Sequence, residues 1–570
     1  VIDNTAFNGV LGAKLVSVIQ YIAPDQPCPT PLPNPLLNTV NVNASTALGI
    51  AFTPTLAIQN LNVDNNGNNA NSTGDGIVLT ADTLARIVGT PTINNNTVTN
   101  TGLNSTQNSS DGIRVNILGN ADVNSVDLVT NDIETNNGNG INAIVNKAPT
   151  LASLNIFNNT ILNNTGGLGT TGSGIVANLI DASALSTITV DKNDVEGNKG
   201  DGFQMLNPNT GATNLAVNFT HNQFIKNGSI VPPSASTTYP PGGMGIDVVL
   251  NNLNATTTTI NVLSDAQGIN TISNNASFGL FLQATNQALY NLNVTGTGAR
   301  NVFDQNVDAG IAIVGGSFVN PNSSLDPTKF SVGNVKIDNV NITRTIAGSH
   351  PSLPNYPFSG DGIGVLMQQY AQMNSFVIGS AAARNTTLAN NAGDGLRINA
   401  IEQSQFRQTL ANGTTAVTPL GQATILLQQI DATANTRNGI DIIRRDNALL
   451  SWDDKANPNA ALFQLGNEFS WQAITDTGSF IHINDVIATG NTINGLNIST
   501  TNAQFPITRV DIVDTNPVVL KYNPKTVGHS VYDSNTGRGM QFIASADSIL
   551  VVNARDTSAS DNRAGGILVQ

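Results

Sequence analysis

A short phrase that recurs along the chain constrains the fold more than any other feature of this sequence. It runs small residue, any residue, glycine, apolar residue, any residue, apolar residue, as at 74–79 and 110–115. From Gly76 onward, the glycines of successive copies lie 27 to 56 residues apart. Such a period indicates structural units that stack and bury a continuous core. The fifteen clear copies have these glycines: Gly12, Gly76, Gly112, Gly140, Gly174, Gly202, Gly245, Gly279, Gly310, Gly362, Gly395, Gly439, Gly495, Gly539 and Gly566.

Three columns of this repeat keep the same character when each glycine is taken as position zero. Positions +1 and +3 are apolar in all fifteen copies, and position −4 is asparagine in eleven of them. Residues two apart in a strand lie on the same face, so +1 and +3 are expected to point inward. Glycine suits a corner where a Cβ would be crowded or φ is positive. Asparagine tolerates turns, and in one column its amides can bond from copy to copy.

A second alternating segment precedes each corner, as at 154–156, 188–190 and 335–337. This order of strand, turn, asparagine, glycine corner and strand resembles the right-handed parallel β-helix of the pectate-lyase-like superfold, with its generic parallel β-helix repeat. The resemblance covers nearly the whole chain. It implies an all-β, right-handed parallel β-helix solenoid of about 15 coils with inserted loops. Because many functions share this fold, the resemblance says little about chemistry.

The domain organisation expected from the repeat is one parallel β-helix over 1–570. Both ends read as coils, with the first copy at Gly12 and the last strand running through Ile567 and Val569. Because an open coil exposes unpaired strand edges, we expect a slice of a longer solenoid, or ends covered by another chain. Trimming of a longer chain is the simpler explanation. Four stretches interrupt the repeat, at 20–38, 228–243, 347–360 and 443–475, and are expected to be inserted loops.

Composition excludes several classes of protein. The formal net charge is −14 and charged residues make up only 11% of the chain, so no basic surface is available for nucleic acid. No apolar run reaches about 18 residues, so no membrane-spanning helix is expected in this segment. Cys28 is the single cysteine, which excludes an internal disulfide.

Aspartates at position −1 of the repeat are the candidate metal ligands. Asp75 and Asp111 occupy this column in neighbouring copies, as do Asp361 and Asp394. Neighbouring strands lie about 4.8 Å apart, so each pair of carboxylates would face each other and hold Ca²⁺ or share a proton. The alternative is that these residues suit the turn and point into water. No cofactor other than calcium is indicated.

A denser group of functional residue types lies at 443–475. Trp452 beside Asp453 and Asp454 is a candidate carbohydrate-binding group, because an aromatic ring next to carboxylates can hold a sugar. The alternative is a solvated loop anchored by the tryptophan. The resemblance implies that hydrolases of the superfold carry Gly-His-Gly and Arg-Ile-Lys, and neither string occurs in this sequence.

These features predict an extracellular structural or adhesive protein, a β-helix displayed at a microbial cell surface as a filament or surface layer. Uniform repeats, low charge and the lack of an assembled catalytic set favour this function. Expected partners are further copies of the chain, other surface proteins or polysaccharide. The alternative is a lyase or glycoside hydrolase that acts on an acidic polysaccharide, including a phage-tailspike-like receptor binder.

Two structural predictions follow from the columns. The +1 side chains of consecutive copies should form one inward stack of Ile77, Ile113, Ile141, Ile175 and Phe203. The −4 asparagines should lie in turns with their amides bonded to neighbouring backbone, at Asn198, Asn275, Asn306, Asn391, Asn435, Asn535 and Asn562.

Overall fold

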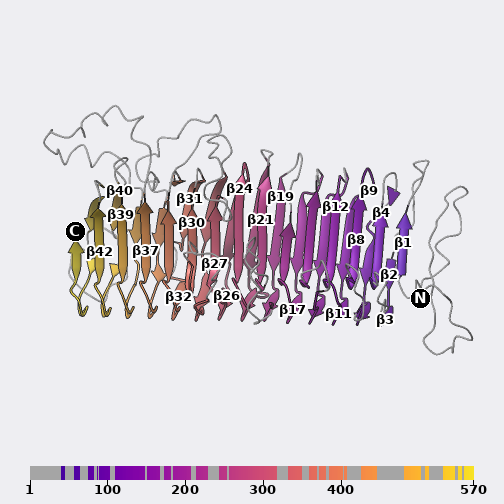
Figure 1. Cartoon of the computed structure of the whole chain (residues 1–570), viewed down its shortest axis with the longest axis horizontal. Coiled ribbons are helices and arrows are strands. Elements are labelled where there is room, and N and C mark those ends of the chain that lie inside the picture. The colour runs from indigo at the N-terminus through magenta and orange to yellow at the C-terminus, as the bar shows by residue number, and fades with distance from the viewer. Residues whose placement is uncertain are drawn as a thin grey trace, which may run out of the picture. The chain divides into compact units, whose positions relative to one another are not determined.

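The structure is a computed structural model of the chain (Figure 1). It describes residues 40–44, 57–64, 75–81, 86–87, 89–102, 110–147, 150–166, 172–180, 184–206, 214–228, 243–252, 256–316, 331–348, 358–368, 371–380, 384–401, 404–406, 425–445, 481–501, 508–512, 530–545, 548, 550–554 and 557–570. The described elements are all β-strands, and their sheets are parallel, as expected for a right-handed parallel β-helix. The coil count stays a prediction.

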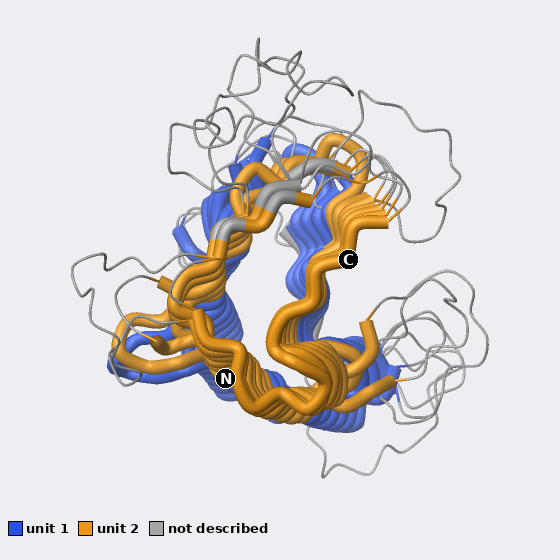
Figure 2. The backbone as a smooth tube through the Cα atoms, turned by 90° about the vertical axis from the view of Figure 1, so that its left-hand side faces the viewer, with its two compact units in different colours: residues 1–282 blue, residues 283–570 orange. Residues whose placement is uncertain are grey.

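The chain divides into two compact units, residues 1–282 and 283–570 (Figure 2). Each unit has three parallel sheets, here called sheets 1, 2 and 3, and each coil passes through sheet 2, sheet 3 and sheet 1 in turn. Viewed along the stack, successive coils of one unit lie one behind another in Figure 2. The boundary falls within β24 (Leu280–Asn286) of sheet 1.

Apart from β24, unit 1 has seven strands in each of the three sheets. Sheet 1 contains β1 (Val40–Ala44), β4 (Ile77–Ala81), β8 (Ile113–Leu118), β12 (Ile141–Asn146), β15 (Ile175–Ile180), β18 (Phe203–Leu206) and β21 (Ile246–Asn252). Sheet 2 contains β2 (Ala57–Gln59), β6 (Thr92–Asn94), β10 (Ser125–Val129), β13 (Ser153–Phe157), β16 (Thr187–Asp191), β19 (Leu215–Thr220) and β22 (Thr257–Ser264). Sheet 3 contains β3 (Asn62–Asp64), β7 (Thr97–Thr99), β11 (Asp132–Glu134), β14 (Thr160–Leu162), β17 (Asp194–Glu196), β20 (Gln223–Ile225) and β23 (Thr271–Ser273). A separate pair joins β5 (Arg86–Ile87) to β9 (Asp122–Val123).

Unit 2 has the same three sheets. Sheet 1 contains β27 (Ala309–Gly315), β30 (Asp361–Met367), β33 (Leu396–Ala400), β37 (Ile440–Arg445), β39 (Leu496–Thr501), β42 (Met540–Ser545) and β45 (Ile567–Val569). Sheet 2 contains β25 (Leu289–Gly296), β28 (Val332–Ile337), β31 (Gln372–Ile378), β35 (Ile425–Gln428), β38 (Ile481–Asn484), β40 (Thr508–Ile512) and β43 (Leu550–Ala554), with β34 (Gln405–Phe406) also paired to β31. Sheet 3 contains β26 (Asn301–Asp304), β29 (Val340–Thr343), β32 (Thr386–Ala389) and β36 (Ile430–Asp431), and β41 (Ser530–Val531) pairs with β44 (Thr557–Ser558).

The predicted inward stack of sheet 1 is confirmed. Parallel pairing places the five +1 side chains at the same register on successive strands, and all five are fully buried. Burial of each such side chain stabilises the fold by about 1.5–3 kcal/mol, so a regular aliphatic column can hold the coils together. The stack consists of Ile77, Ile113, Ile141, Ile175 and Phe203.

The repeated glycine is required by close packing at the corner. A Cβ added to Gly112 would lie 2.8 Å from the carbonyl oxygen of Gly140 and 2.4 Å from Cγ2 of Ile133. Gly140 meets the same crowding from Gly174, at 2.7 Å. Of the two reasons that the sequence offered, steric crowding is therefore the one that applies at these corners.

The predicted asparagine ladder lies at the corner between sheet 3 and sheet 1, and we call it the 3–1 ladder. Each rung donates its backbone N–H to the side-chain oxygen of the next rung, for example from Asn136 to Asn164 at 3.1 Å and from Asn164 to Asn198 at 3.1 Å. In unit 2 the ladder runs through Asn391, Asn435, Asn491, Asn535 and Asn562. The prediction is confirmed at Asn198, Asn275, Asn391, Asn435, Asn535 and Asn562, and Asn306 is fully buried at the equivalent position.

Fixed spacing from the glycine missed some rungs of the 3–1 ladder. Asn164 and Asn227 are rungs although they lie farther than four residues before Gly174 and Gly245, because extra residues intervene. Thr101 donates from its backbone N–H and its hydroxyl to Asn136. Asn108, which has the expected spacing, lies outside the described residues.

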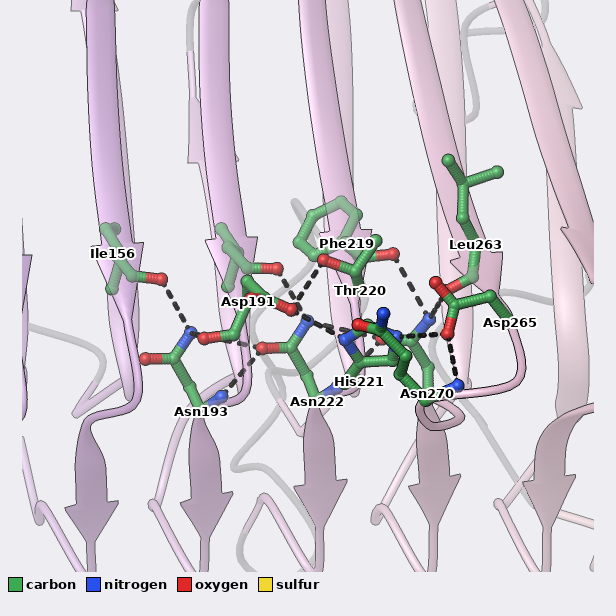
Figure 3. Close-up of polar contacts among 12 residues, drawn as sticks. Ile156, Asp191, Asn193, Phe219, Thr220, His221, Asn222, Leu263, Asp265 and Asn270 are labelled. Carbon is green, nitrogen blue, oxygen red and sulfur yellow. Dashed lines mark hydrogen bonds and ion pairs between the residues drawn. The ribbon is translucent and has the colours of Figure 1, made fainter.

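A second ladder, which the sequence analysis did not predict, lies at the corner between sheet 2 and sheet 3 of unit 1. We call it the 2–3 ladder. Asn159 donates its backbone N–H and its Nδ2 to Oδ1 of Asn193, both at 2.9 Å, and the next rungs repeat the pattern (Figure 3). Its rungs are buried, with at most 1% exposure: Asn96, Asn131, Asn159, Asn193, Asn222 and Asn270.

Candidate functional site

The aspartates that the sequence singled out lie at the start of sheet 1 strands. In unit 1, Oδ1 of Asp75 accepts the backbone N–H of Asp111 at 2.8 Å, and Oδ1 of Asp111 accepts that of Asn139 at 2.8 Å. Asp75 is 7% exposed and Asp111 is fully buried. The column is thus a third line of hydrogen bonds between coils, and the interpretation that these aspartates point into water is wrong.

An arginine lies between the two carboxylates of unit 1. Arg114, two residues after Gly112, reaches Oδ2 of Asp75 at 3.0 Å and Oδ2 of Asp111 at 2.7 Å. Burial raises the pKa of Asp75 to about 7, although the guanidinium of Arg114 opposes this shift. Asp75 and Asp111, the pair predicted to bind calcium, are therefore paired with the guanidinium of Arg114.

The equivalent cluster of unit 2 contains three carboxylates around Arg397, and Nε of Arg437 also lies 3.8 Å from Oδ2 of Asp394. Arg397 reaches Oδ2 of Asp394 at 2.9 Å, Oδ2 of Asp441 at 3.5 Å and Oδ2 of Asp361 at 3.9 Å. All three aspartates are at most 2% exposed. Burial raises the pKa of Asp361 to about 7, against the opposing charge of Arg397. As in unit 1, Oδ1 of Asp361 accepts the N–H of Asp394 at 2.8 Å.

Calcium binding by these residues stays a prediction. The structure brings Asp75 together with Asp111, and Asp361 with Asp394, as their shared column predicts. Within the residues that the structure describes, no three or more His, Cys, Asp and Glu side chains form a group suited to a metal ion.

A third carboxylate cluster, on β18 and β21 of unit 1, was not identified from the sequence. Nε2 of Gln204 donates to Oδ2 of Asp201 at 3.0 Å and to Oδ2 of Asp247 at 3.2 Å. Oδ1 of Asp201 also accepts the backbone N–H groups of Gly243 and Met244. Asp201 is 1% exposed and Asp247 is fully buried. Asp247 lies at +2 rather than −1 of the repeat, so a search of one column could not find this pair.

Burial raises both carboxyl pKa values in this third cluster. The pKa of Asp201 rises to about 6, and that of Asp247 rises well above its ordinary value because of burial and of the charge of Asp201. No lysine or arginine among the described residues forms an ion pair with either carboxylate. Among the described residues, this cluster therefore differs from those around Arg114 and Arg397, which contain an arginine.

His221 lies between two carboxylates of neighbouring coils. Its Nδ1 lies 2.9 Å from Oδ1 of Asp191, and its Nε2 lies 3.0 Å from Oδ1 of Asp265, so one ring links three successive coils (Figure 3). A neutral imidazole carries one N–H, and only the imidazolium donates to both carboxylates at once. His221 also has a φ of 57°, so it occupies the left-handed turn position just before a ladder rung. This contact is a clamp between coils.

The remaining site predictions fall outside the described residues. Trp452, Asp453 and Asp454 lie in the segment 446–480, which the structure does not describe. Cys28, in the segment 20–38, also lies outside the described residues. Of the insertion expected at 443–475, residues 443–445 belong to β37. The rest of it lies outside the described residues.

No protein-family model matches this chain, and neither the curated proteins nor the solved structures include a significant match to it. The described part of the chain has no helix with the length and apolar character that a membrane crossing requires.

Proposed function

We propose that this protein is an extracellular structural β-helix, displayed at a cell surface and assembled into a filament or layer with adhesive properties. The observation that carries the proposal is the use of the polar side chains. Buried asparagines and aspartates accept backbone N–H groups of the neighbouring coil, as Asn193 does for Asn159 and Asp75 does for Asp111. Such bonding favours a rigid, durable scaffold over a mobile binding site.

Electron microscopy and sedimentation of the native material test this proposal. We expect filaments or ordered sheets, recovered from the cell exterior and resistant to protease. A discrete, soluble monomer recovered from inside cells would contradict the proposal. The same preparations can be tested for adhesion to polysaccharide and to whole cells.

A second candidate function is the cleavage of an acidic polysaccharide. The observation that favours it is the convergence of Asp361, Asp394 and Asp441 on Arg397, which lie on three successive sheet 1 strands. Paired carboxylates are the acid–base groups of most glycoside hydrolases. Release of reducing or unsaturated sugars by the wild-type protein, abolished in Asp394→Asn, would favour the enzyme. An absence of products across a panel of uronate polymers would favour the scaffold.

A further inference from the structure

Two carboxylate clusters of the fold share three positions of the repeat but carry different residues at the middle one. In unit 2, Asp394 lies at position −1, Arg397 at +2, and Asp441 pairs with Arg397 from the next strand. In unit 1, Asp201 and Gln204 hold the same two positions, and Asp247 pairs with Gln204 from the next strand. The neutral Gln204 therefore replaces the guanidinium that balances the carboxylates of unit 2.

The hydrogen bonds of the unit 1 cluster leave one carboxylate oxygen without a partner, whereas the equivalent oxygen of unit 2, Oδ1 of Asp441, accepts Nδ2 of Asn497 at 2.7 Å. Oδ1 of Asp201 is satisfied by two backbone N–H groups, and Oδ2 of both aspartates accepts from the same Nε2 of Gln204. Oδ1 of Asp247 is buried and has no hydrogen-bond partner among the described residues. A buried carboxylate oxygen without a partner is costly, which indicates that a further group belongs there.

We propose that Asp201, Gln204 and Asp247 form a binding site for a divalent cation, with Ca²⁺ as the preferred ion. Oδ2 of Asp201 and both oxygens of Asp247 supply hard oxygen ligands, which suit Ca²⁺ and Mg²⁺. Rotation of the Gln204 amide by half a turn exchanges its two N–H contacts for one further oxygen ligand. Ca²⁺ tolerates irregular coordination completed by water, whereas Mg²⁺ demands near-octahedral geometry, so Ca²⁺ fits a site of this kind better.

This site differs from the four aspartates that the sequence offered for calcium. Asp75 and Asp111 have Arg114, and Asp361 and Asp394 have Arg397, within ion-pair range. The bound cation would play the role in unit 1 that the guanidinium of Arg397 plays in unit 2. It would also fix the point at which the inserted segment after Gly228 returns to the coil, because Gly243 donates to Asp201.

The test is thermal unfolding of the full chain, after removal of metal with a chelator, over a titration of CaCl₂ with MgCl₂ as the comparison. We expect the melting temperature to rise with Ca²⁺ and to saturate, with a weaker response to Mg²⁺. Because the site is buried, the titration is repeated with Ca²⁺ present during refolding. No saturable response to either ion would overturn the proposal.

Three variants locate the response. Asp247→Asn keeps the shape of the side chain and should weaken the apparent Ca²⁺ affinity at least tenfold. Gln204→Arg keeps both carboxylates and supplies the missing guanidinium, so it should remove the Ca²⁺ response without lowering the melting temperature of the metal-free protein. Asp75→Asn, in the cluster around Arg114, should keep the wild-type response. A wild-type Ca²⁺ response in Gln204→Arg, or its loss in Asp75→Asn, would contradict the assignment.

Discussion

The corner between sheet 2 and sheet 3 is built in two different ways in the two units. In unit 1 it carries an unbroken ladder in which Asn159 donates twice to Asn193. In unit 2 the first equivalent position still holds a buried asparagine, Asn301. The following positions hold buried aliphatic side chains, at Val340, Ile430 and Val486, or hydroxyl side chains. The hydroxyl of Ser530, for example, accepts the N–H of Val486 at 3.2 Å.

The turn itself is the same in both units. The residue before the rung has a positive φ in each, with 56° at Lys192 in unit 1 and 49° at Gln429 in unit 2. The asparagine is therefore not needed to form the corner. In unit 1 directional hydrogen bonds hold one coil against the next at this corner. In unit 2 the apolar core extends into the corner, and side-chain packing holds the coils together there. This difference predicts opposite responses to the same kinds of substitution.

The largest effect is expected from breaking the ladder of unit 1. Asn159→Leu removes the acceptor of the N–H and Nδ2 groups of Asn131 and the donor to the carbonyl oxygen of Leu128. Each buried group left without a partner costs about 1–3 kcal/mol, so we expect unfolding to become easier by about 2–5 kcal/mol. Chemical denaturation measures this change. A loss below about 1 kcal/mol would mean that the ladder adds little.

A smaller effect is expected from building amides into unit 2. Ile430→Asn exchanges a buried aliphatic side chain for an isolated amide and should cost about 2–4 kcal/mol. Val486→Asn in the next coil should cost a similar amount. The double variant should be less destabilised than the sum, with a favourable coupling of about 0.5–3 kcal/mol, because the two amides can bond to each other. Strict additivity in the double-mutant cycle would contradict this prediction.

The carboxylate clusters predict a dependence on pH of intermediate size. The pKa of Asp361 in the folded state is about 7, against about 3.9 for an unfolded aspartate, so the folded state binds the extra proton between these values. Stability should therefore fall as the pH rises from about 4 to about 7. Asp361→Asn should flatten this part of the profile of melting temperature against pH. An unchanged slope would contradict the assignment to Asp361.

The smallest effect is expected at the exposed end of the His221 clamp. A backbone N–H from Gln267 and the contact with His221 lower the pKa of Asp265. A lowered carboxyl pKa contributes stability above the ordinary range of aspartate, and that contribution is lost as the pH falls through the folded value. Asp265→Asn should remove only this small loss of stability at acid pH. The matched control is Asp304→Asn in unit 2, which removes the carboxylate partner of Arg344. This variant should keep the acid-side loss of stability that is attributed to the contact between Asp265 and His221.

The sequence predicted the parts of the fold that repeat at fixed spacing. The isoleucine stack and most rungs of the 3–1 ladder lie at constant distances from a glycine, and packing of identical coils forces that regularity. The 2–3 ladder also has a sequence pattern, because Asn131, Asn159 and Asn193 each lie five residues before a rung of the 3–1 ladder. Columns counted from the glycine alone do not reveal this ladder.

The chemistry of the clusters was harder to predict. Arg114 and Arg397 lie three residues after an aspartate, but the sequence does not reveal that the outer side of sheet 1 is buried there. Without that burial, an aspartate at a turn is expected to face water. Asp201 and Asp247 are 46 residues apart in the sequence, and their pairing depends on the chain returning in register, which no local pattern encodes.

Native-state hydrogen exchange tests the contrast between the two corners most directly. We predict that the backbone N–H groups of Asn131, Asn159 and Asn193 exchange as slowly as those of the sheet 1 core, because each is bonded to the next amide. The N–H of Val486, bonded to a single hydroxyl, should exchange faster than these three. Equal protection at Val486, or faster exchange at the asparagine rungs, would contradict the claim that the ladder fixes the coils of unit 1.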